Sequence, residues 1–400
     1  MLSVTEARSR ILKVFQSLPS ETLALTEGLG RVLSTPLLAR TTQPPAAVSA
    51  MDGYAVRAAD VASLPAKLKV VGEITAGSSF TGNLQPGQAV RIFTGAPLPS
   101  GSDTVVIQEN VIRDDGWIDL TEATRAGAYV RPEGLDFRGG ETALPPGQRL
   151  TARDLGLAAA MNHAWLPVHR RPRVAILATG DEIVLPGDPR GPSQIVSSNA
   201  FSLTGLVLAD GSLPINLGIA PDRGDVLQQL AEGAKGCDLL VTTGGASVGK
   251  HDLVRSALAD SGLEVDFWQI AMRPGKPLLF GRLHDTPLLG LPGNPVSTLV
   301  CGLNFLRPIL RRLQGLEAEP RFLTATLGKN LPANDQREDY LRSHVHWNAE
   351  GRATVTPFER QDSSMLAVLS QADALAMRPP HAPSAKTGDP IQILLLDGGI

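Results

Sequence analysis

The sequence has little cysteine and no long apolar run, and both features narrow what the chain can be. Its 400 residues include two cysteines, Cys237 and Cys301. Both stand in apolar surroundings without CxxC or Cys/His ligand spacing, so buried reduced thiols are favoured over a disulfide or a metal site. No stretch approaches the ~18 apolar residues that a membrane-spanning helix needs. Residues 1–13 also lack the apolar core of a secretory signal, so we expect a cytoplasmic protein with no membrane partner.

An excess of charge of one sign is also missing. The chain has 37 Lys and Arg against 40 Asp and Glu, a formal net charge of -3. No run of Lys and Arg resembles one that follows a phosphate backbone, which argues against nucleic acid as the main partner. A small anionic ligand is still compatible with this balance, because a local cluster can be positive inside a nearly neutral protein.

The length predicts two to four domains. A capping box at Ser3–Glu6 opens an amphipathic helix that Pro19 is expected to end. Residues 44–138 carry short β-branched runs between glycines and prolines, the pattern of a small all-β domain. Residues 151–162 are expected to be helical, with Thr151 as N-cap. They could pack with the opening helix, which would make the β segment an insertion.

Strand and helix signals alternate from Arg173 to about Leu313, and short strands return from Arg321. Four apolar runs in this region each end in a loop with a carboxylate or a rigid Pro/Gly turn. They are Val174–Glu182, Ile215–Asp222, Leu239–Asp252 and Leu288–Pro295. In an open parallel sheet, ligands bind at the carboxyl ends of the strands. If the four runs are neighbouring strands, their loops therefore build one pocket.

Helices are expected between these strands, at 198–209, 222–234, 252–260 and 296–313. The last would begin with Asn294 as N-cap and Pro295 at the first helical position. Pro308 is expected to kink or shorten it.

The glycine-rich segment 244–250 has two competing interpretations. Gly244 and Gly249-Lys250 match the start of a nucleotide P-loop, but His251 stands where a P-loop needs a hydroxyl for magnesium. A turn without any ligand is the other alternative. We favour an anion site in which Gly244 and Gly245 offer backbone N–H groups and Ser247 a hydroxyl, with Asp252 where the next helix begins.

Two further turns carry rigid or charged residues. The first is stiff because two prolines fix φ; it comprises Pro292, Gly293, Asn294 and Pro295. It could simply start a helix, although its N–H groups also suit an anion. The second sets Arg273 and Lys276 around a Pro-Gly turn. Such residues are usually solvated surface charges, but near the crevice they would bind phosphate or another oxyanion.

Carboxylates follow three of the strand-like runs, at Glu182, Asp222 and Asp252. Each alone could be a helix cap or a first-turn charge. Their joint placement is less ordinary, because together they could hold a divalent cation. Acidic and basic groups in one pocket are what a magnesium-dependent reaction on a phosphate ester needs.

Several ordered motifs carry a resemblance to a known family. They are Ser49–Val56, Arg91–Pro99, Thr179–Glu182, Gly244–Gly249 and Leu291–Ser297. Together they closely resemble the MoeA family, the molybdopterin molybdenumtransferases, over nearly the whole chain. The resemblance implies a multidomain α/β plus β fold. An elongated helical domain (1–43 and 139–170) is split by an inserted small β domain (44–138). A central three-layer α/β domain like that of molybdopterin adenylyltransferases (171–316) and a β-barrel-like domain (317–400) follow.

The resemblance also implies the chemistry. The substrate would be adenylylated molybdopterin, into whose dithiolene molybdate is inserted while AMP leaves, with Mg2+ assisting. A homodimer would form the site between the α/β domain of one subunit and the inserted domain of the other. Molybdopterin adenylyltransferase would be a possible upstream partner.

The family motifs carry site residues onto this chain. Asp52, Thr94, Arg131 and Asp136 would face the site from the inserted domain, and Glu182, Asp222 and Asp252 from the α/β domain. Asp52, Glu182, Asp222 and Asp252 would supply the metal ligands. Pro292 and Pro295 would shape the wall, Arg273 and Lys276 would bind substrate, and Arg342 and Ser363 would come from the last domain. Gln269 and Arg273 stand where the family pattern has lysines. Arginine keeps the positive charge of lysine, whereas glutamine does not.

Two alternatives to this function stay open. The adenylyltransferase step is one, since the related α/β domain performs it. A non-catalytic scaffold is the other, because a similar domain occurs in gephyrin. The sequence does not distinguish molybdate from tungstate, which are near-isosteric oxyanions.

Overall fold

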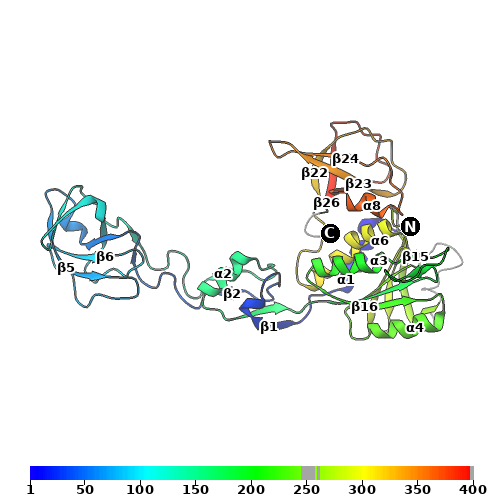
Figure 1. The fold of residues 1–400 in the computed structure, drawn as a ribbon, viewed down its shortest axis with the longest axis horizontal. Helices are drawn as coiled ribbons and strands as arrows, with labels where there is room; N and C mark the ends of the chain where they lie inside the picture. Colours follow the sequence, from blue (N-terminus) through cyan, green and yellow to red (C-terminus); the bar gives the residue numbers. More distant parts are fainter. Residues whose placement is uncertain (245–256, 259–261, 397–400) are drawn as a thin grey trace. The chain divides into compact units, whose positions relative to one another are not determined.

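The computed structural model describes residues 1–244, 257–258 and 262–396. The chain forms two compact units (Figure 1). The first comprises Met1–Glu21, Gly30–Ser34 and Pro167–Ile400, and the second Thr22–Leu29 and Thr35–Leu166. The predicted four-part division is finer than these units and stays a prediction. In the described part of the chain, no helix is both long and apolar enough to span a bilayer.

A six-stranded sheet forms the centre of the first unit, in the order β16-β13-β17-β21-β20-β18. The strands are β13 (Arg173–Thr179), β16 (Leu213–Ala220), β17 (Leu239–Thr243), β18 (Leu263–Gln269), β20 (Pro277–Leu283) and β21 (Thr286–Leu291). The first four in spatial order are parallel to one another. Strand β20 runs antiparallel to both of its neighbours, β21 and β18. The four predicted runs are therefore neighbouring parallel strands, as the sequence predicted, and their carboxyl ends meet at one edge.

Helices cover both faces of this sheet because β13 is apolar on both sides. Val174 and Ile176 pack with α3 (Asn199–Ala209) and α6 (Pro295–Cys301), and Ala175 and Leu177 pack with α4 (Gly224–Ala231). Figure 1 shows α3 and α4 on opposite sides of β16. The buried face of α1 (Val4–Val14) joins the α3 layer. The expected three-layer α/β arrangement is thus present.

The opening helix is shorter than the sequence predicted. Ser3 caps it by accepting the N–H of Glu6 at 3.1 Å, but the Glu6 carboxylate accepts from Arg10 instead of closing a capping box. The helix ends at Val14, well before Pro19, since Phe15 adopts an extended conformation and is only 4% exposed. Burial of the Phe15 ring therefore ends the helix earlier than proline would.

The last helix of the α/β region is divided into three pieces, as expected near Pro308. α6 begins after Asn294, with Pro295 in its first turn. A π-helical segment (Gly302–Leu306) separates it from α7 (Arg307–Leu313), which has Pro308 in its first turn. Proline lacks the N–H that would continue the α-helical ladder. The predicted helix at 252–260 lies mostly outside the described residues.

A closed ring of five strands follows in the first unit, in the order β23-β24-β22-β26-β25 and back to β23. These are β22 (Leu323–Leu327), β23 (Glu338–Trp347), β24 (Ala353–Pro357), β25 (Ala374–Arg378) and β26 (Pro390–Leu395). Its interior is a separate apolar cluster. Strand β19 (Met272–Arg273) pairs with β23, and α8 (Leu366–Ser370) precedes β25. The C-terminal β-barrel expected from the sequence is confirmed.

The second unit contains another six-stranded sheet, in the order β7-β4-β6-β5-β9-β8. Its strands are β4 (Gly53–Val56), β5 (Lys67–Ile74), β6 (Gln88–Ile92), β7 (Thr104–Ile107), β8 (Val111–Asp114) and β9 (Trp117–Leu120). The predicted N-cap Thr151 closes a capping box with Asp154 at the start of α2 (Ala152–Ala160).

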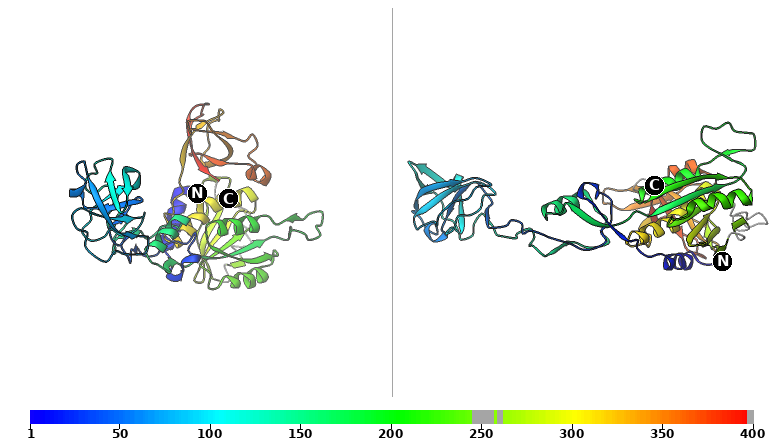
Figure 2. Two further views of the ribbon diagram at one scale, coloured as in Figure 1. Left: turned by 60° about the vertical axis from the view of Figure 1, so that its left-hand side comes forward. Right: turned by 90° about the horizontal axis from the view of Figure 1, so that it is seen from below.

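Short strands complete the structure. They are β1 (Ser20–Ala24), β2 (Leu37–Leu38), β3 (Val48–Ser49), β10 (Val130–Arg131), β11 (Thr142–Leu144), β12 (Trp165–His169), β14 (Ile183–Val184) and β15 (Ile195–Val196). Strands β14 and β15 pair and carry a segment, green in Figure 2, that projects from the α/β part of the first unit.

Candidate active site

The loops after β13 and β16 are joined at the carboxyl edge of the sheet. The N–H of Gly180 donates to the carbonyl of Ala220 at 3.1 Å, and the N–H of Asp222 donates to Oδ1 of Asp181 at 2.9 Å. Asp181 was not among the predicted site residues. Its carboxylate fixes the loop of Asp222 against the loop of Glu182, so the structure brings these two predicted carboxylates onto adjoining loops.

Glu182 is exposed and folds back over its own loop. A Cβ at Gly180, where φ is +140°, would lie 2.3 Å from Oε2 of Glu182. The carbonyl of Glu182 accepts the N–H of Ile195 at 2.7 Å, which holds the loop from its other side. The positive φ favours glycine at position 180, whereas the exposed Glu182 side chain could move aside for a Cβ.

The predicted Pro/Gly turn packs on the end of β17. Nδ2 of Asn199, at the start of α3, donates to Thr243 Oγ1 at 2.9 Å and to the carbonyl of Gly293 at 2.7 Å. A Cβ at Gly293 would lie 3.5 Å from Cα of Gly244. Asn199 thus links three elements at the site edge. Sequence reasoning missed it because a single asparagine at a helix start usually indicates only a cap.

The barrel contributes Ser363 to this turn. Nδ2 of Asn294 donates to Ser363 Oγ at 2.7 Å, and the N–H of Val296 donates to the Ser363 carbonyl at 3.1 Å. Asn294 is the N-cap of α6 as predicted, but its side chain reaches the barrel and makes no hydrogen bond to its own helix.

Arg342 lies beneath the segment that carries Ser363. Its side chain is 1% exposed, and its Nε donates to Gln361 Oε1 at 3.2 Å and its Nη1 to the Met365 carbonyl at 3.2 Å. Burial lowers the pKa of this guanidinium, which Asp362 partly offsets. In this geometry, Arg342 orders the 361–365 segment and thereby positions Ser363.

The two basic turn residues differ in their surroundings. Arg273 pairs with Asp339 and, at 3.1 Å, with Asp335. The hydrogen bond to Asp339 raises the pKa of Arg273, yet burial raises the pKa of Asp339 more strongly than the arginine lowers it. Asp339 is only 4% exposed, so burial dominates its pKa. Lys276 is partly buried and has no ion pair within 4.0 Å in the described part of the chain. Lys276 is therefore the more available cation.

A second cluster lies in the second unit, at the start of β4 and the end of β6. Oδ1 of Asp52 accepts from the N–H and from Oγ1 of Thr94, both at 2.8 Å. These bonds lower the pKa of Asp52, and Arg91 lowers it further. The guanidinium of Arg91 lies 5.1 Å from the ring centre of Tyr54 and 4.9 Å from that of Phe93. Asp52 and Thr94 are brought together as predicted, and Arg91 is an additional cation held between two rings.

Arg131 and Asp136 lie on two segments that pair with residues 43–50 through their backbone. Strand β10 places Arg131 opposite Val48, and the N–H of Ala50 donates to the Tyr129 carbonyl at 2.8 Å. Asp136 is exposed, and its N–H donates to the Gln43 carbonyl at 3.0 Å. The structure therefore brings the Arg131 strand to the loop that precedes Asp52.

Three predicted residues, Gly245, Ser247 and Asp252, lie outside the described residues. Within residues 1–244, 257–258 and 262–396, no group of three or more His, Cys, Asp or Glu side chains is arranged to hold a metal ion. Mg2+ nevertheless fits the exposed Glu182 and Asp222, because it is usually held by one or two carboxylates with waters and substrate phosphates completing its shell.

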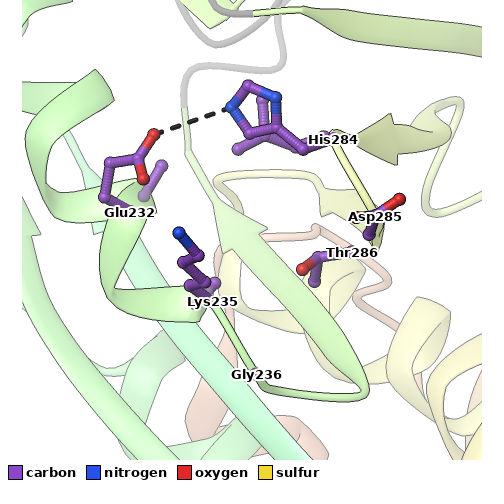
Figure 3. Close-up of a pocket in the computed structure, with 9 residues that line it drawn as sticks. Glu232, Lys235, Gly236, His284, Asp285 and Thr286 are labelled. Carbon is purple, nitrogen blue, oxygen red and sulfur yellow. Dashed lines mark ion pairs between the residues drawn. The ribbon is translucent and has the colours of Figure 1, made fainter.

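A cavity of about 420 Å³ lies at the other edge of the sheet (Figure 3). Glu232, Lys235, His284 and Thr286 line it, and His284 Nε2 lies 3.6 Å from Glu232 Oε1. It adjoins the amino ends of β17 and β21 and contains none of the predicted residues. Ligands of open α/β sheets bind at the carboxyl ends of the strands. We therefore place the candidate site at the carboxyl edge and not in this cavity.

Comparison with known proteins gives the family. Models of the MoeA N-terminal region (domains I and II), a probable molybdopterin binding domain and the MoeA C-terminal region (domain IV) match residues 2–162, 175–312 and 324–396. The chain belongs to the MoeA family. It is 36% identical to a molybdopterin molybdenumtransferase of a Nostoc species, with 99% of this chain and 94% of the relative covered. The Haemophilus influenzae protein of the same name is 33% identical, with 98% of each chain covered.

A solved structure agrees with the fold. The molybdopterin biosynthesis MoeA protein of Pyrococcus horikoshii matches with a TM-score of 0.86 and 30% identity, covering 99% of each chain. The family and fold class predicted from the sequence are thereby confirmed. The expectation of an enzyme of molybdenum cofactor biosynthesis agrees with the transferase name of the relatives.

Proposed function

We propose that this chain inserts molybdenum into adenylylated molybdopterin and releases AMP. The observation that carries the proposal is the joined loops of Glu182 and Asp222 beside the Asn294 turn, in a chain of the MoeA family. Molybdate and the substrate phosphates are both anionic, so their approach costs repulsion unless cations and N–H dipoles offset it. Lys276 and the N–H groups of the glycine and proline turns would supply this compensation.

The acidic residues have a different part in the proposal. Glu182 and Asp222 would hold Mg2+, which when bound polarises the phosphoanhydride of the substrate. Asp52, held ionised by Thr94, would orient substrate from its own cluster. Neither cysteine is proposed as a nucleophile: Cys301 is buried, and the reacting thiolates belong to the substrate.

Reconstitution tests this function. Adenylylated molybdopterin, molybdate and Mg2+ are incubated with the protein, and AMP and active cofactor are measured. Glu182→Gln is expected to lower turnover at least about tenfold, as for loss of one charge-stabilising group. Glu232→Gln is the matched control, since it is the same substitution at a glutamate on the other edge of the sheet. Full turnover by Glu182→Gln would contradict the assignment. Pyrophosphate release from ATP and molybdopterin would favour an adenylyltransferase instead.

We further propose a homodimer in which Asp52 of one subunit and Glu182 of the other contribute to each site, as the resemblance of the sequence motifs to the MoeA family implies. Mixing the inactive variants Asp52→Ala and Glu182→Ala would then regenerate intact sites. An equal mixture that exchanges subunits freely should regain roughly a quarter of wild-type turnover, because half of the dimers are mixed and each has one intact site. No recovery after demonstrated subunit exchange would indicate sites built within one chain.

A further inference from the structure

A second cavity in the first unit lies away from the candidate active site. Its volume is about 380 Å³. It is bounded by α7, by the segment 318–323 and by the end of β26. None of the predicted site residues lines it. Its size is within the range of small-molecule sites.

Three arginines line this cavity: Arg307, Arg311 and Arg321. Arg307 and Arg311 are four residues apart on α7 and therefore share one helix face. Nε of Arg307 donates to Asp210 Oδ2 at 3.1 Å, and Nε of Arg311 donates to the Glu317 carbonyl at 2.7 Å. In both contacts the donor is Nε, so the terminal nitrogens of the guanidinium group take no part in them.

Each carboxylate around the cavity is already paired with an arginine. Asp210 pairs with Arg307, Glu317 with Arg321 at 2.7 Å, and Glu319 with Arg8 at 2.9 Å. Within the described residues, Arg311 has no carboxylate within 4.0 Å and its two terminal nitrogens make no hydrogen bond.

The surroundings of Arg311 favour an incoming anion. Burial lowers the pKa of its guanidinium, the nearby Arg307 and Arg321 lower it further, and Asp210 and Glu317 oppose this. Asp210 and Glu317 offset the charges of Arg307 and Arg321, whereas Arg311 has no carboxylate partner of its own among the described residues. An anion placed beside Arg311 would supply the missing opposite charge.

Part of the cavity lining is apolar. Leu323 and Leu395 line it together with Leu394 and Pro308. Leu323 is 43% exposed, which leaves apolar surface for a ligand to cover. A ligand that contacts both the arginines and the apolar residues therefore carries a compact anion and an apolar group.

We propose that this cavity binds a small organic phosphate, with the phosphate between Arg311 and Arg321 and the apolar group against Leu323 and Leu395. Guanidinium groups match phosphate oxygens in bidentate geometry. The proposal is independent of the function proposed for the carboxyl edge of the sheet.

Calorimetric titration of the full chain with phenyl phosphate, inorganic phosphate and phenol tests the proposal. Phenyl phosphate should bind more tightly than inorganic phosphate, and phenol should not bind measurably. Arg311→Gln should weaken phenyl phosphate binding about tenfold or more, as expected for one lost charge-assisted contact. Leu323→Ala should weaken phenyl phosphate binding and leave inorganic phosphate unchanged.

Two controls make the result decisive. Arg352→Gln removes an exposed arginine from a barrel turn and should leave binding unchanged. Lys276→Gln removes the cation proposed for the active site and should leave the Arg311-dependent binding unchanged; loss of binding in Lys276→Gln but not in Arg311→Gln would place the phosphate at the candidate active site and overturn the proposal. If Arg311→Gln does not fold, Arg321→Gln serves in its place, because the Arg321 side chain is 78% exposed. Wild-type affinity in that variant and in Arg311→Lys, or no binding by the wild type, would refute the site.

Discussion

Asp52 accepts two hydrogen bonds from Thr94 through a single carboxylate oxygen, one from the backbone N–H and one from the hydroxyl, each 2.8 Å long. These bonds lower the pKa of Asp52, the backbone bond most and the hydroxyl next, and Arg91 adds to them. The arrangement keeps an exposed carboxylate ionised and fixed in direction, which suits a residue that meets substrate.

Thr94→Val should shift the acid side of the pH–activity profile to higher pH. The substitution removes the hydroxyl bond and keeps the N–H, so the pKa of Asp52 should rise toward its ordinary value. A lowered folded-state pKa means that the bonds favour the ionised form above it and are lost as pH falls through it. AMP release measured across the acid range should show this shift, with turnover at neutral pH reduced less than in Asp52→Ala.

Thr94→Ser is the matched control for this prediction. It retains both donors, and its profile should follow that of the wild type. A Thr94→Val profile identical to that of wild type would show that the hydroxyl does not set the charge of Asp52 during turnover.

The four parallel strands of the α/β sheet could be predicted because each is a largely apolar run followed by glycine or proline. β13, for example, is buried on both faces, so its composition alone indicates a central parallel strand. The parallel neighbours then place Glu182 and Asp222 at one edge. This part of the site follows from local pattern and one topological rule.

Other parts depend on contacts that no local pattern encodes. Arg273 reads as a free basic residue in the sequence, yet Asp335 and Asp339, more than 60 residues later, neutralise it. Asp181 binds the N–H of Asp222, and Asn199 binds the carbonyl of Gly293. Both contacts join segments that are distant in the sequence. The early end of α1 likewise depends on where Phe15 packs, which is a tertiary effect.

Asn199→Ala should lower the free energy of unfolding by about 1–3 kcal/mol, because it removes two hydrogen bonds that each contribute roughly 0.5–1.5 kcal/mol. It removes the donors to Thr243 and Gly293 at the edge that carries the candidate site. Urea unfolding measures this loss, and the substrate KM should rise because the 292–295 turn is less fixed. Gln229→Ala, at an exposed position of α4, should change stability by less than about 0.5 kcal/mol. Equal effects of the two substitutions would contradict the proposed link.

Gly275→Ala should destabilise the turn between Arg273 and Lys276. Gly275 has φ of +114°, and a Cβ there would lie 2.4 Å from Sγ of Cys301. Backbone strain of this kind costs about 1–3 kcal/mol, which thermal or urea unfolding would detect. Adding Cys301→Ala removes the clash but not the strain, so it should restore only part of the loss.

Gly205→Ala is the contrasting glycine control. A Cβ at Gly205 meets nothing within 4 Å, and Gly205 lies within α3. Alanine there should stabilise the protein by about 0.5–1 kcal/mol. If Gly275→Ala were also neutral or stabilising, the turn would not be held against Cys301 as the structure shows.

The two thiols should differ in reactivity, one reacting in the native protein and the other only in the unfolded chain. Cys301 is fully buried and burial strongly raises the pKa of its thiol, whereas Cys237 is only partly buried, with a pKa raised first by burial and then by Asp238. Since the thiolate is the reacting form, titration of the native protein with a disulfide reagent should modify one thiol, faster as pH rises. The second should react only after denaturation. Cys237→Ser should abolish the native reaction and Cys301→Ala should preserve it; modification of Cys301 in the native protein would show that the turn at Gly275 opens.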